Sequence, residues 1–188
     1  TRAYAFFEKK LRQVEFEPEK IKKVITSYFS VVSIVLDADD NPYLVFESLN
    51  AKGRPLTQAD LIRNYFFMRI HVDKQEEVYK NLWLPMQTAL HDDLTEFIRH
   101  YLMKDGNIVK QGDVYYALKD SVSTINAIDY LTELKKYSVY YQRLKHPEYE
   151  KEPELERMFR RLNRIEVTTA YPLLLNFYSN YADNRIDK

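Results

Sequence analysis

The sequence predicts a mostly α-helical protein with one short strand or small β element near residues 31–36. Apolar residues recur three and four positions apart over most of the chain, as they do on one face of a helix. Residue types typical of helix ends stand between these periodic stretches. A short run of β-branched residues lies at 31–36. From the periodic stretches and their caps we expect about eight to ten helices.

Two helices are predicted before this strand. In the first, Phe6, Phe7 and Leu11 are spaced to share one helix face. Pro18 opens the second helix, because proline is well tolerated in the first turn. The β-branched run follows, and the Asp-rich residues 37–41 close it. Because an isolated strand needs a partner, we expect its partner to lie outside this piece of chain.

A helix–turn–helix of about 30 residues is predicted next. Asn41, which is followed by proline, is a suitable N-cap for a helix over about 42–51. Gly53 stands where a left-handed residue commonly ends a helix. Thr57 and Asp60 have the spacing of a capping box, with Asp in place of Glu, and should start the second helix.

The rest of the chain predicts further helices. Pro85 should kink the first of them, and Asp113 is expected to cap a short one. The expected ranges are about 74–91, 94–104, a short helix from Asp113, 124–145, 154–165 and 168–181. Residues 146–153 contain two prolines and several glutamates, which predict a loop or linker. We therefore divide the chain into a helical region, 1–145, and a helical pair, 146–188, which packs on that region or starts a following helical subdomain.

Composition excludes several classes of protein. The 28 basic and 28 acidic residues give a net charge of zero, so any phosphate binding must come from a local patch. Cysteine is absent, which excludes disulfides and thiolate-bound metals and fits a reducing cytoplasm. With 3 glycines there is no glycine-rich phosphate loop. No apolar run reaches the roughly 18 residues of a membrane helix, so we expect a cytoplasmic protein without a membrane partner.

Residues 42–66 carry the most specific pattern in the sequence. Within them, Phe-Glu-Ser-Leu-Asn-Ala-Lys-Gly-Arg-Pro-Leu-Thr-Gln-Ala-Asp-Leu-Ile-Arg-Asn resembles the motif Phe-Glu-x-Leu-Asn-x-x-Gly-x-x-Leu-x-x-x-Asp-Leu-Ile-Arg/Lys-Asn of the GmrSD-type restriction endonuclease family. The resemblance extends from residue 1 to about residue 120. The Asp-Gly-Gln-Gln-Arg nucleotide signature of the family and a His-Asn-His nuclease pattern are both missing. We therefore expect a piece of a longer protein, with the signature upstream and the nuclease downstream.

The resemblance implies a bacterial anti-phage protein. In this family a ParB-like N-terminal domain uses a nucleoside triphosphate to control a nuclease that attacks modified or foreign DNA. This chain would be the helical portion that supports nucleotide binding and couples it to the nuclease. We expect no cofactor and no nucleotide turnover in this piece alone, whereas the full-length protein would take a nucleoside triphosphate with Mg²⁺. The expected partners are the remaining domains of the parent chain and DNA.

Four motif residues are candidates for the nucleotide pocket or its support: Asn50, Gly53, Arg63 and Asn64. An amide and a guanidinium on two helices joined at a glycine would offer planar contacts to a phosphate or a base. Ordinary structural roles would explain the same residues, namely a helix cap, a turn and a salt bridge from Arg63 to Glu47 or Asp60. The structural positions of the motif are Phe46, Leu49, Leu56, Thr57 and Asp60.

A second hypothesis is a non-catalytic helical module that binds DNA or a protein partner. Arg157, Arg160, Arg161 and Arg164 fall on one helical stripe, along which a DNA backbone would fit. Glutamates just before the stripe, such as Glu156, would neutralise it and leave an ordinary solvated face. The 16 tyrosines would either stack on bases or line helix–helix interfaces.

No catalytic residue and no metal site is assigned. Glu96 and His100 have the i, i+4 spacing of two metal ligands on a helix, but the sequence offers no third ligand in register with them. The paired aspartates at 39–40 and 92–93 fall in predicted turns, where Asp is favoured for structural reasons. We therefore assign no general acid, general base or nucleophile.

Overall fold

A computed structural model of the chain describes residues 2–13, 17–31, 33, 35 and 56–187. The expected helix over about 42–51 lies outside these residues, and so do Phe46, Leu49, Asn50 and Gly53. The chain forms two compact units, residues 1–40 and 41–188. Its secondary structure is mostly α-helical, which confirms the predicted fold class. Across the described ranges, no helix is both long and apolar enough to cross a bilayer.

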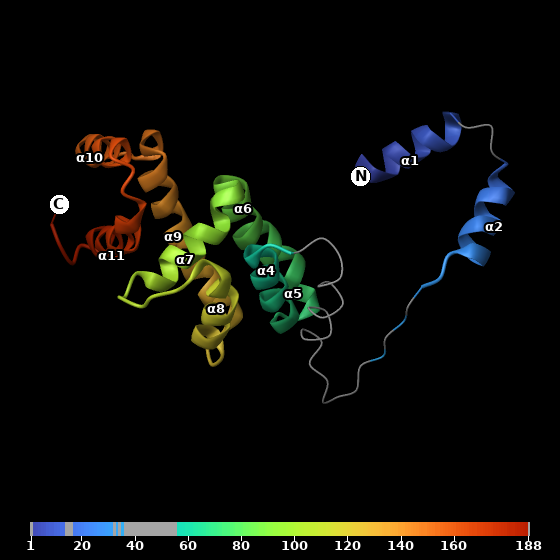
Figure 1. Ribbon diagram of the computed structural model, residues 1–188, viewed down its shortest axis with the longest axis horizontal. Helices are drawn as coiled ribbons and strands as arrows, with labels where there is room; N and C mark the ends of the chain where they lie inside the picture. Colours follow the sequence, from blue (N-terminus) through green and yellow to red (C-terminus); the bar gives the residue numbers. More distant parts are fainter. Residues whose placement is uncertain (1, 14–16, 32, 34, 36–55, 188) are drawn as a thin grey trace. The chain divides into compact units, whose positions relative to one another are not determined.

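The first unit contains the two predicted N-terminal helices, α1 (Arg2–Gln13) and α2 (Pro18–Tyr28) (Figure 1). Proline stands at the start of α2 as predicted. The short strand near residues 31–36 finds no support, because Val31, Ser33 and Val35 lie outside regular secondary structure. The other three positions of that run fall outside the described residues.

The second unit begins with α4 (Gln58–Arg69). The predicted capping box is present: the Thr57 hydroxyl accepts from the backbone N–H of Asp60 at 3.1 Å, and the Asp60 carboxylate accepts from the backbone N–H of Thr57 at 3.2 Å. Ile62 and Phe66 lie one turn apart on α4 and are fully buried. The cap therefore sets where α4 begins, and its apolar face anchors it to the core.

The predicted kink near Pro85 is a π turn. Helix α5 (Val72–Val78) continues through a π-helical turn, η1 (Tyr79–Trp83), into α6 (Leu84–Leu90). The backbone N–H of Leu84 donates to the carbonyl of Tyr79, five residues back. This wider turn lets the chain remain helical through Pro85, whose ring would clash with the preceding turn of a regular α-helix.

Three helices form the centre of the core: α7 (Leu94–Met103), α8 (Val114–Val122) and α9 (Ala127–Lys145). Helix α9 begins later than the expected residue 124, because the Asn126 side chain accepts from the backbone N–H groups of Ile128 and Asp129. Many of the tyrosines pack here rather than on the surface. The buried ones are Tyr101, Tyr115, Tyr130, Tyr137, Tyr140, Tyr141, Tyr171 and Tyr178.

The C-terminal helices, α10 (Pro153–Arg164) and α11 (Tyr171–Ala182), belong to the same compact unit. Helix α11 packs against α7 and α9, and α10 contacts α9. Figure 1 shows this pair on the side of α9 away from α4 and α5. Between α9 and α10 the chain makes the predicted irregular connection, with one 3₁₀ turn at Pro147–Tyr149.

A side chain of α4 caps the N-terminal end of α8. The side-chain oxygen of Gln58 accepts from the backbone N–H of Tyr115 at 2.8 Å. Asp113 precedes α8 and is the predicted cap, but its side chain makes no capping hydrogen bond. The prediction for Asp113 is therefore wrong, because a side chain from another helix already satisfies the exposed N–H group.

A second side chain of α4 caps the C-terminal end of α8. The Arg69 guanidinium donates to the carbonyl oxygens of Val122 at 2.9 Å, Ser123 at 3.3 Å and Ile125 at 3.1 Å. The last carbonyls of a helix have no partner within it, and a cation there also complements the helix dipole. We call the Gln58 and Arg69 contacts together the α4–α8 clamp.

Replacing Gln58 with alanine should lower the free energy of unfolding by about 1 kcal/mol, because the N–H of Tyr115 loses its partner. The matched variant Asp113→Ala should change it by less than about 0.5 kcal/mol, since its side chain makes no capping bond. Urea unfolding of both variants measures the difference. An Asp113→Ala loss as large as that of Gln58→Ala would contradict the assignment of the cap.

Candidate functional site

Two of the predicted site residues lie together on α4. Arg63 and Asn64 both line a cavity of about 450 Å³ between α4 and α5. Its wall includes Phe67, Gln75 and Tyr79. The Gln75 amide bonds the carbonyls of Phe67 and Ile70 at 2.7 and 3.0 Å, which ties α5 to the end of α4. We call this hollow the Arg63–Asn64 cavity.

Arg63 forms an ion pair with Asp60 at 3.3 Å, as one of the structural alternatives predicts. Asp60 is thus shared between the cap of α4 and this ion pair. Both side chains are about one-third exposed, so the pair itself adds little stability, about 0–1 kcal/mol. It engages one nitrogen of Arg63, and we find no further partner for that guanidinium within the described ranges. The other donors of Arg63 therefore have no partner in the part of the chain that the structure describes.

A second cavity, of about 230 Å³, is also lined by Arg63. Thr57, Ala59, Asp60 and Arg63 contribute to it from the start of α4. The opposite wall comes from η1, α6 and the segment that follows α6. The residues of that wall are Trp83, Gln87, His91, Asp92, Leu94 and Thr95. We call this hollow the Trp83 cavity; because Arg63 lines both cavities, the two are neighbours.

Two side-chain atoms in the wall of the Trp83 cavity are buried without a hydrogen-bond partner. They are Nε1 of Trp83 and Oε1 of Gln87. Trp83 is only 1% exposed, so its N–H cannot turn outward to bulk water. Most buried polar groups in folded proteins are paired, and an unpaired one costs about 1–3 kcal/mol. Both atoms are closed off from solvent, so they lie within the wall, without a partner among the described residues, rather than at the surface of the cavity.

The backbone at the rim of this cavity is strained. His91 ends α6 with φ 45° and ψ −118°. A side chain with a Cβ seldom adopts this conformation, which costs on the order of 1–3 kcal/mol. The backbone N–H of His91 closes the helix by donating to the carbonyl of Gln87. His91 was not among the predicted site residues, since nothing local in the sequence indicates a positive φ there.

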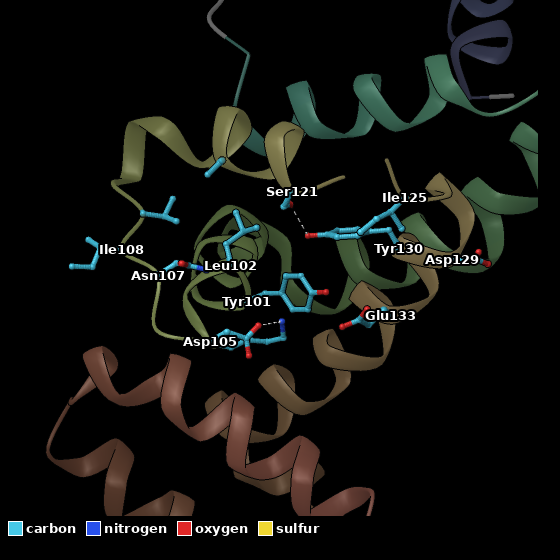
Figure 2. Close-up of a pocket in the computed structure, with 13 residues that line it drawn as sticks. Tyr101, Leu102, Asp105, Asn107, Ile108, Ser121, Ile125, Asp129, Tyr130 and Glu133 are labelled. Carbon is cyan, nitrogen blue, oxygen red and sulfur yellow. Dashed lines mark hydrogen bonds and ion pairs between the residues drawn. The ribbon is translucent and has the colours of Figure 1, made fainter. Parts of the chain in front are cut away.

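The largest of the cavities described is elsewhere, between α7, α8 and α9, and encloses about 510 Å³. Figure 2 shows the Tyr101 and Tyr130 rings in its wall and Asp105, Asp129 and Glu133 around it. Some of its polar groups are paired with one another: the Tyr130 hydroxyl lies 3.4 Å from the Ser121 hydroxyl, and Lys104 bonds Asp105 at 2.7 Å. Burial raises the pKa of the Tyr101 hydroxyl, which keeps it protonated. Contacts within the protein therefore engage part of the polar lining of this cavity.

The Glu96 and His100 pair, considered above for metal binding, belongs to the core. His100 is 2% exposed, with Nδ1 3.2 Å from the Tyr141 hydroxyl and Nε2 3.1 Å from a Glu96 oxygen. Arg99 donates from Nε to the other Glu96 oxygen at 2.9 Å. Nowhere in the described part of the chain do three His, Cys, Asp or Glu side chains gather in a way that would hold a metal. The ring of His100 joins α7 to α9 instead.

The arginine stripe of α10 is exposed, as the sequence predicts. Arg160 pairs with Glu156 at 2.8 Å, the neutralising contact expected from their spacing. For Arg157, Arg161 and Arg164 we find no ion pair with any described residue. Phe159 points the opposite way and is buried. Three guanidinium groups on this face are therefore without an ion-pair partner among residues 56–187.

Burial of His100 should make the protein less stable in acid. Burial, with help from Arg99 and Lys145 and against Glu96, lowers the pKa of His100 to about 4 from its usual 6.5. Between these values the unfolded chain binds the proton and the folded chain does not, so the free energy of unfolding falls as pH drops from 6.5 to 4. The full loss from this group is about 3 kcal/mol.

Denaturant unfolding from pH 7 to pH 4.5 measures this dependence. His100→Gln should be less stable at pH 7 but should lose less stability on acidification than the parent sequence. The control is Ser138→Ala, which changes a buried polar side chain that does not titrate and should leave the slope unchanged. An unaltered slope in His100→Gln would show that other groups cause the dependence.

Comparison with known proteins adds one finding. Residues 1–67 match the family model of the GmrSD restriction endonuclease, N-terminal domain. No curated protein and no solved structure matches the chain. The matched range ends within α4, just past Arg63 and Asn64, and does not reach the expected residue 120. The match confirms that residues 1–67, which include the motif, resemble the N-terminal domain of the GmrSD-type restriction endonuclease family.

Proposed function

We propose that this chain is the helical portion of a GmrSD-like anti-phage defence protein that supports nucleoside-triphosphate binding. It would couple that binding to a DNA nuclease elsewhere in the full-length protein. The family match suggests the restriction and defence role, and the lack of cysteine fits the cytoplasm of a bacterial cell. The partners in this proposal are the remaining domains of the parent chain and DNA.

One observation carries the nucleotide part of the proposal: two polar residues of the family motif, Arg63 and Asn64, line the same cavity. A guanidinium presents several donors in a planar fork that matches phosphate oxygens, and an amide adds a further donor. The cavity volume of about 450 Å³ lies in the range of small-molecule sites. Mg²⁺ would arrive bound to the phosphates, as is usual for this ion.

The α4–α8 clamp supports the coupling part of the proposal. Helix α4 carries the motif side chains, and Gln58 and Arg69 bond it to both ends of α8. Buried Ile62 and Phe66 add an apolar contact between these bonds. A ligand that shifted α4 would therefore have to shift α8 with it or break the clamp. A bonded pair of helices of this kind is one physical route by which a change at one site would reach another.

In the parent protein with its natural flanking segments, Arg63→Ala should weaken nucleoside-triphosphate binding by about 10- to 100-fold. The physical reason is the loss of a charge-assisted hydrogen bond worth about 1.5–3 kcal/mol. Asn50→Ala should also weaken binding, and Arg63→Lys should fall between alanine and arginine because it keeps the charge without the fork. Isothermal titration calorimetry with ATP and GTP in the presence of Mg²⁺ measures the effect.

Arg157→Ala is the matched control, since it removes an exposed arginine far along the chain from the cavity. Thermal unfolding establishes that each variant is folded. Binding that neither Asn50→Ala nor Arg63→Ala weakens would remove these residues from the site.

A second candidate function is DNA binding by α10, alone or beside the first. The observation that favours it is the set of three exposed arginines without an ion pair among the described residues: Arg157, Arg161 and Arg164. They lie within two turns of one helix, so a phosphate backbone would reach all three. Glu156 neutralises Arg160, which limits the patch to these three charges.

If α10 binds DNA, the chain should retard a short duplex in native gels at low salt. Replacing Arg157 and Arg161 with glutamate should abolish the shift, and the dependence of log K on log salt should lose about 2 in slope. The control exchanges two other exposed cations, Lys74 and Lys110, for glutamate, which makes the same change in net charge. Equal loss in both double variants would indicate a general charge effect and contradict a site on α10.

A further inference from the structure

An apolar groove of about 290 Å³ lies between α10 and α11. The rings of Phe159 and Tyr178 line it from within, since both are buried and their centroids are 5.8 Å apart. Its walls are apolar side chains of both helices: Leu155, Met158 and Leu162 from α10, and Leu174, Phe177 and Tyr181 from α11. Met158 is 52% exposed and Phe177 is 49% exposed, so the groove is open to solvent. We call it the α10–α11 groove.

The two helices run antiparallel along the groove. The Tyr171 hydroxyl, at the start of α11, donates to the side chain of Asn163, near the end of α10, at 2.9 Å. Further along α11, the Tyr178 hydroxyl donates to Glu150, which precedes α10. The end of α11 therefore lies beside the start of α10, and the two ends of the groove have different neighbours.

The shape of the groove suits a helix. Leu155, Met158 and Leu162 lie at i, i+3 and i+7 on α10, which covers about 10 Å along the helix axis. An amphipathic helix that binds in a groove presents its apolar anchors at the same spacing. Among residues 56–187 the structure has no strand, so an extended peptide would find no sheet edge to pair with there.

The rim of the groove along the middle and end of α10 is basic. Arg161 follows Met158 by three residues and Arg157 by four, so the two guanidinium groups form a row beside Met158. Neither has an ion-pair partner among residues 56–187. The acidic groups lie towards the opposite end: Glu154 is in the first turn of α10, and Asp187 lines the groove after the end of α11.

Other charges close to these two helices are paired within the protein. Arg160 pairs with Glu156 at 2.8 Å. Asp183 pairs with Lys136 at 2.8 Å and with Arg185 at 3.9 Å. A partner that fills the groove beside Arg157 and Arg161 must therefore supply acidic groups next to its apolar side chains.

A second copy of this chain does not have that chemistry in its exposed amphipathic helices. Helices α1 and α2 both carry exposed apolar side chains, among them Phe7 and Ile25. However, α1 contains four basic residues and one glutamate, and α2 contains three lysines and one glutamate. Either helix would place like charges beside Arg157 and Arg161. DNA would neutralise the arginines, but it has no apolar side chains to fill the groove.

We propose that the α10–α11 groove binds an amphipathic helix of a different protein. The apolar side chains of that helix fill the groove, and its acidic side chains pair with Arg157 and Arg161. Apolar contacts then supply most of the affinity, and the charged rim selects the partner and its orientation. The inference goes beyond the proposed function, because it requires neither nucleotide nor DNA.

A synthetic peptide of about four helical turns tests the proposal. It carries leucine at i, i+3, i+4 and i+7, glutamate beside this stripe, and a fluorescein label; we call it the Glu peptide. Its fluorescence anisotropy should rise to a plateau as the 188-residue chain is added up to about 100 μM. A scrambled peptide of the same composition, without the stripe, should not bind. If the Glu peptide does not bind, or if the scrambled peptide binds equally well, the proposal is wrong.

Phe177→Ser should weaken binding of the Glu peptide about 10-fold or more, because it removes an apolar wall of the groove. Tyr116→Ser is the matched control: it replaces an exposed aromatic residue of α8, outside the groove, and should leave binding unchanged. Circular dichroism establishes that both variants are folded. Binding that Phe177→Ser leaves unchanged would mean that the peptide is held by charge alone, and would contradict a site in the groove.

Exchanging charges across the interface gives a result that a merely destabilised variant cannot give. The double variant Arg157→Glu, Arg161→Glu should bind the Glu peptide about 10-fold more weakly. It should bind a peptide with lysine in place of glutamate more tightly than the parent chain does. Lys74→Glu with Lys110→Glu makes the same change in net charge away from α10 and should not reverse the preference. An unreversed preference in the arginine variant would remove the rim from the site.

Two further measurements separate the other occupants. Phe177→Ser should leave the retardation of duplex DNA unchanged, since DNA would contact only the arginines. A loss of retardation in this variant would make the groove part of a DNA site instead. Sedimentation of the chain alone should show a monomer. A dimer that Phe177→Ser dissociates would identify a second copy as the occupant and overturn the proposal.

Discussion

The position of α4 is the constraint on which the rest of the second unit depends. Its own start is set by the capping box of Thr57 and Asp60, and its side chains then complete another helix, α8. Gln58 supplies a missing acceptor at one end of α8 and Arg69 supplies donors at the other. Because helix ends leave backbone groups unpaired, these contacts hold two helices in a single relative position. The cavity walls that α4 forms are therefore held in a fixed position relative to α8.

This placement explains why the cavities beside α4 differ from the others. One face of α4 enters the core, so Arg63 is left at a boundary between two hollows. In the cavity of Figure 2 several polar groups have partners within the protein, and so does the ring of His100. Beside Trp83 and Gln87 they do not. An unpaired buried donor and acceptor lower the stability of the folded protein. Such groups are commonly retained where water or a ligand can bond to them.

The π turn before Pro85 has a related consequence. It lets α5 and α6 run as one helical rod through a residue that would otherwise break it, and it determines which side chains of that rod meet α4. Trp83 is the last residue of this turn and Gln87 lies one turn further. The strained backbone of His91 then ends the rod at the rim of the same cavity. The π turn and the strained backbone of His91 thus both lie at one small region.

The sequence by itself determined the helical class, most helix positions, the capping box and the family of residues 1–67, because periodicity, caps and a motif are local properties of the chain. It also predicted Arg63 and Asn64 as candidate residues of the nucleotide pocket. Only the tertiary structure decided that Gln58 rather than Asp113 caps α8, that His100 is a core residue, and that Trp83 and Gln87 are buried without partners. These outcomes depend on which side chains from distant segments reach the same place, and packing rather than spacing along the chain settles that.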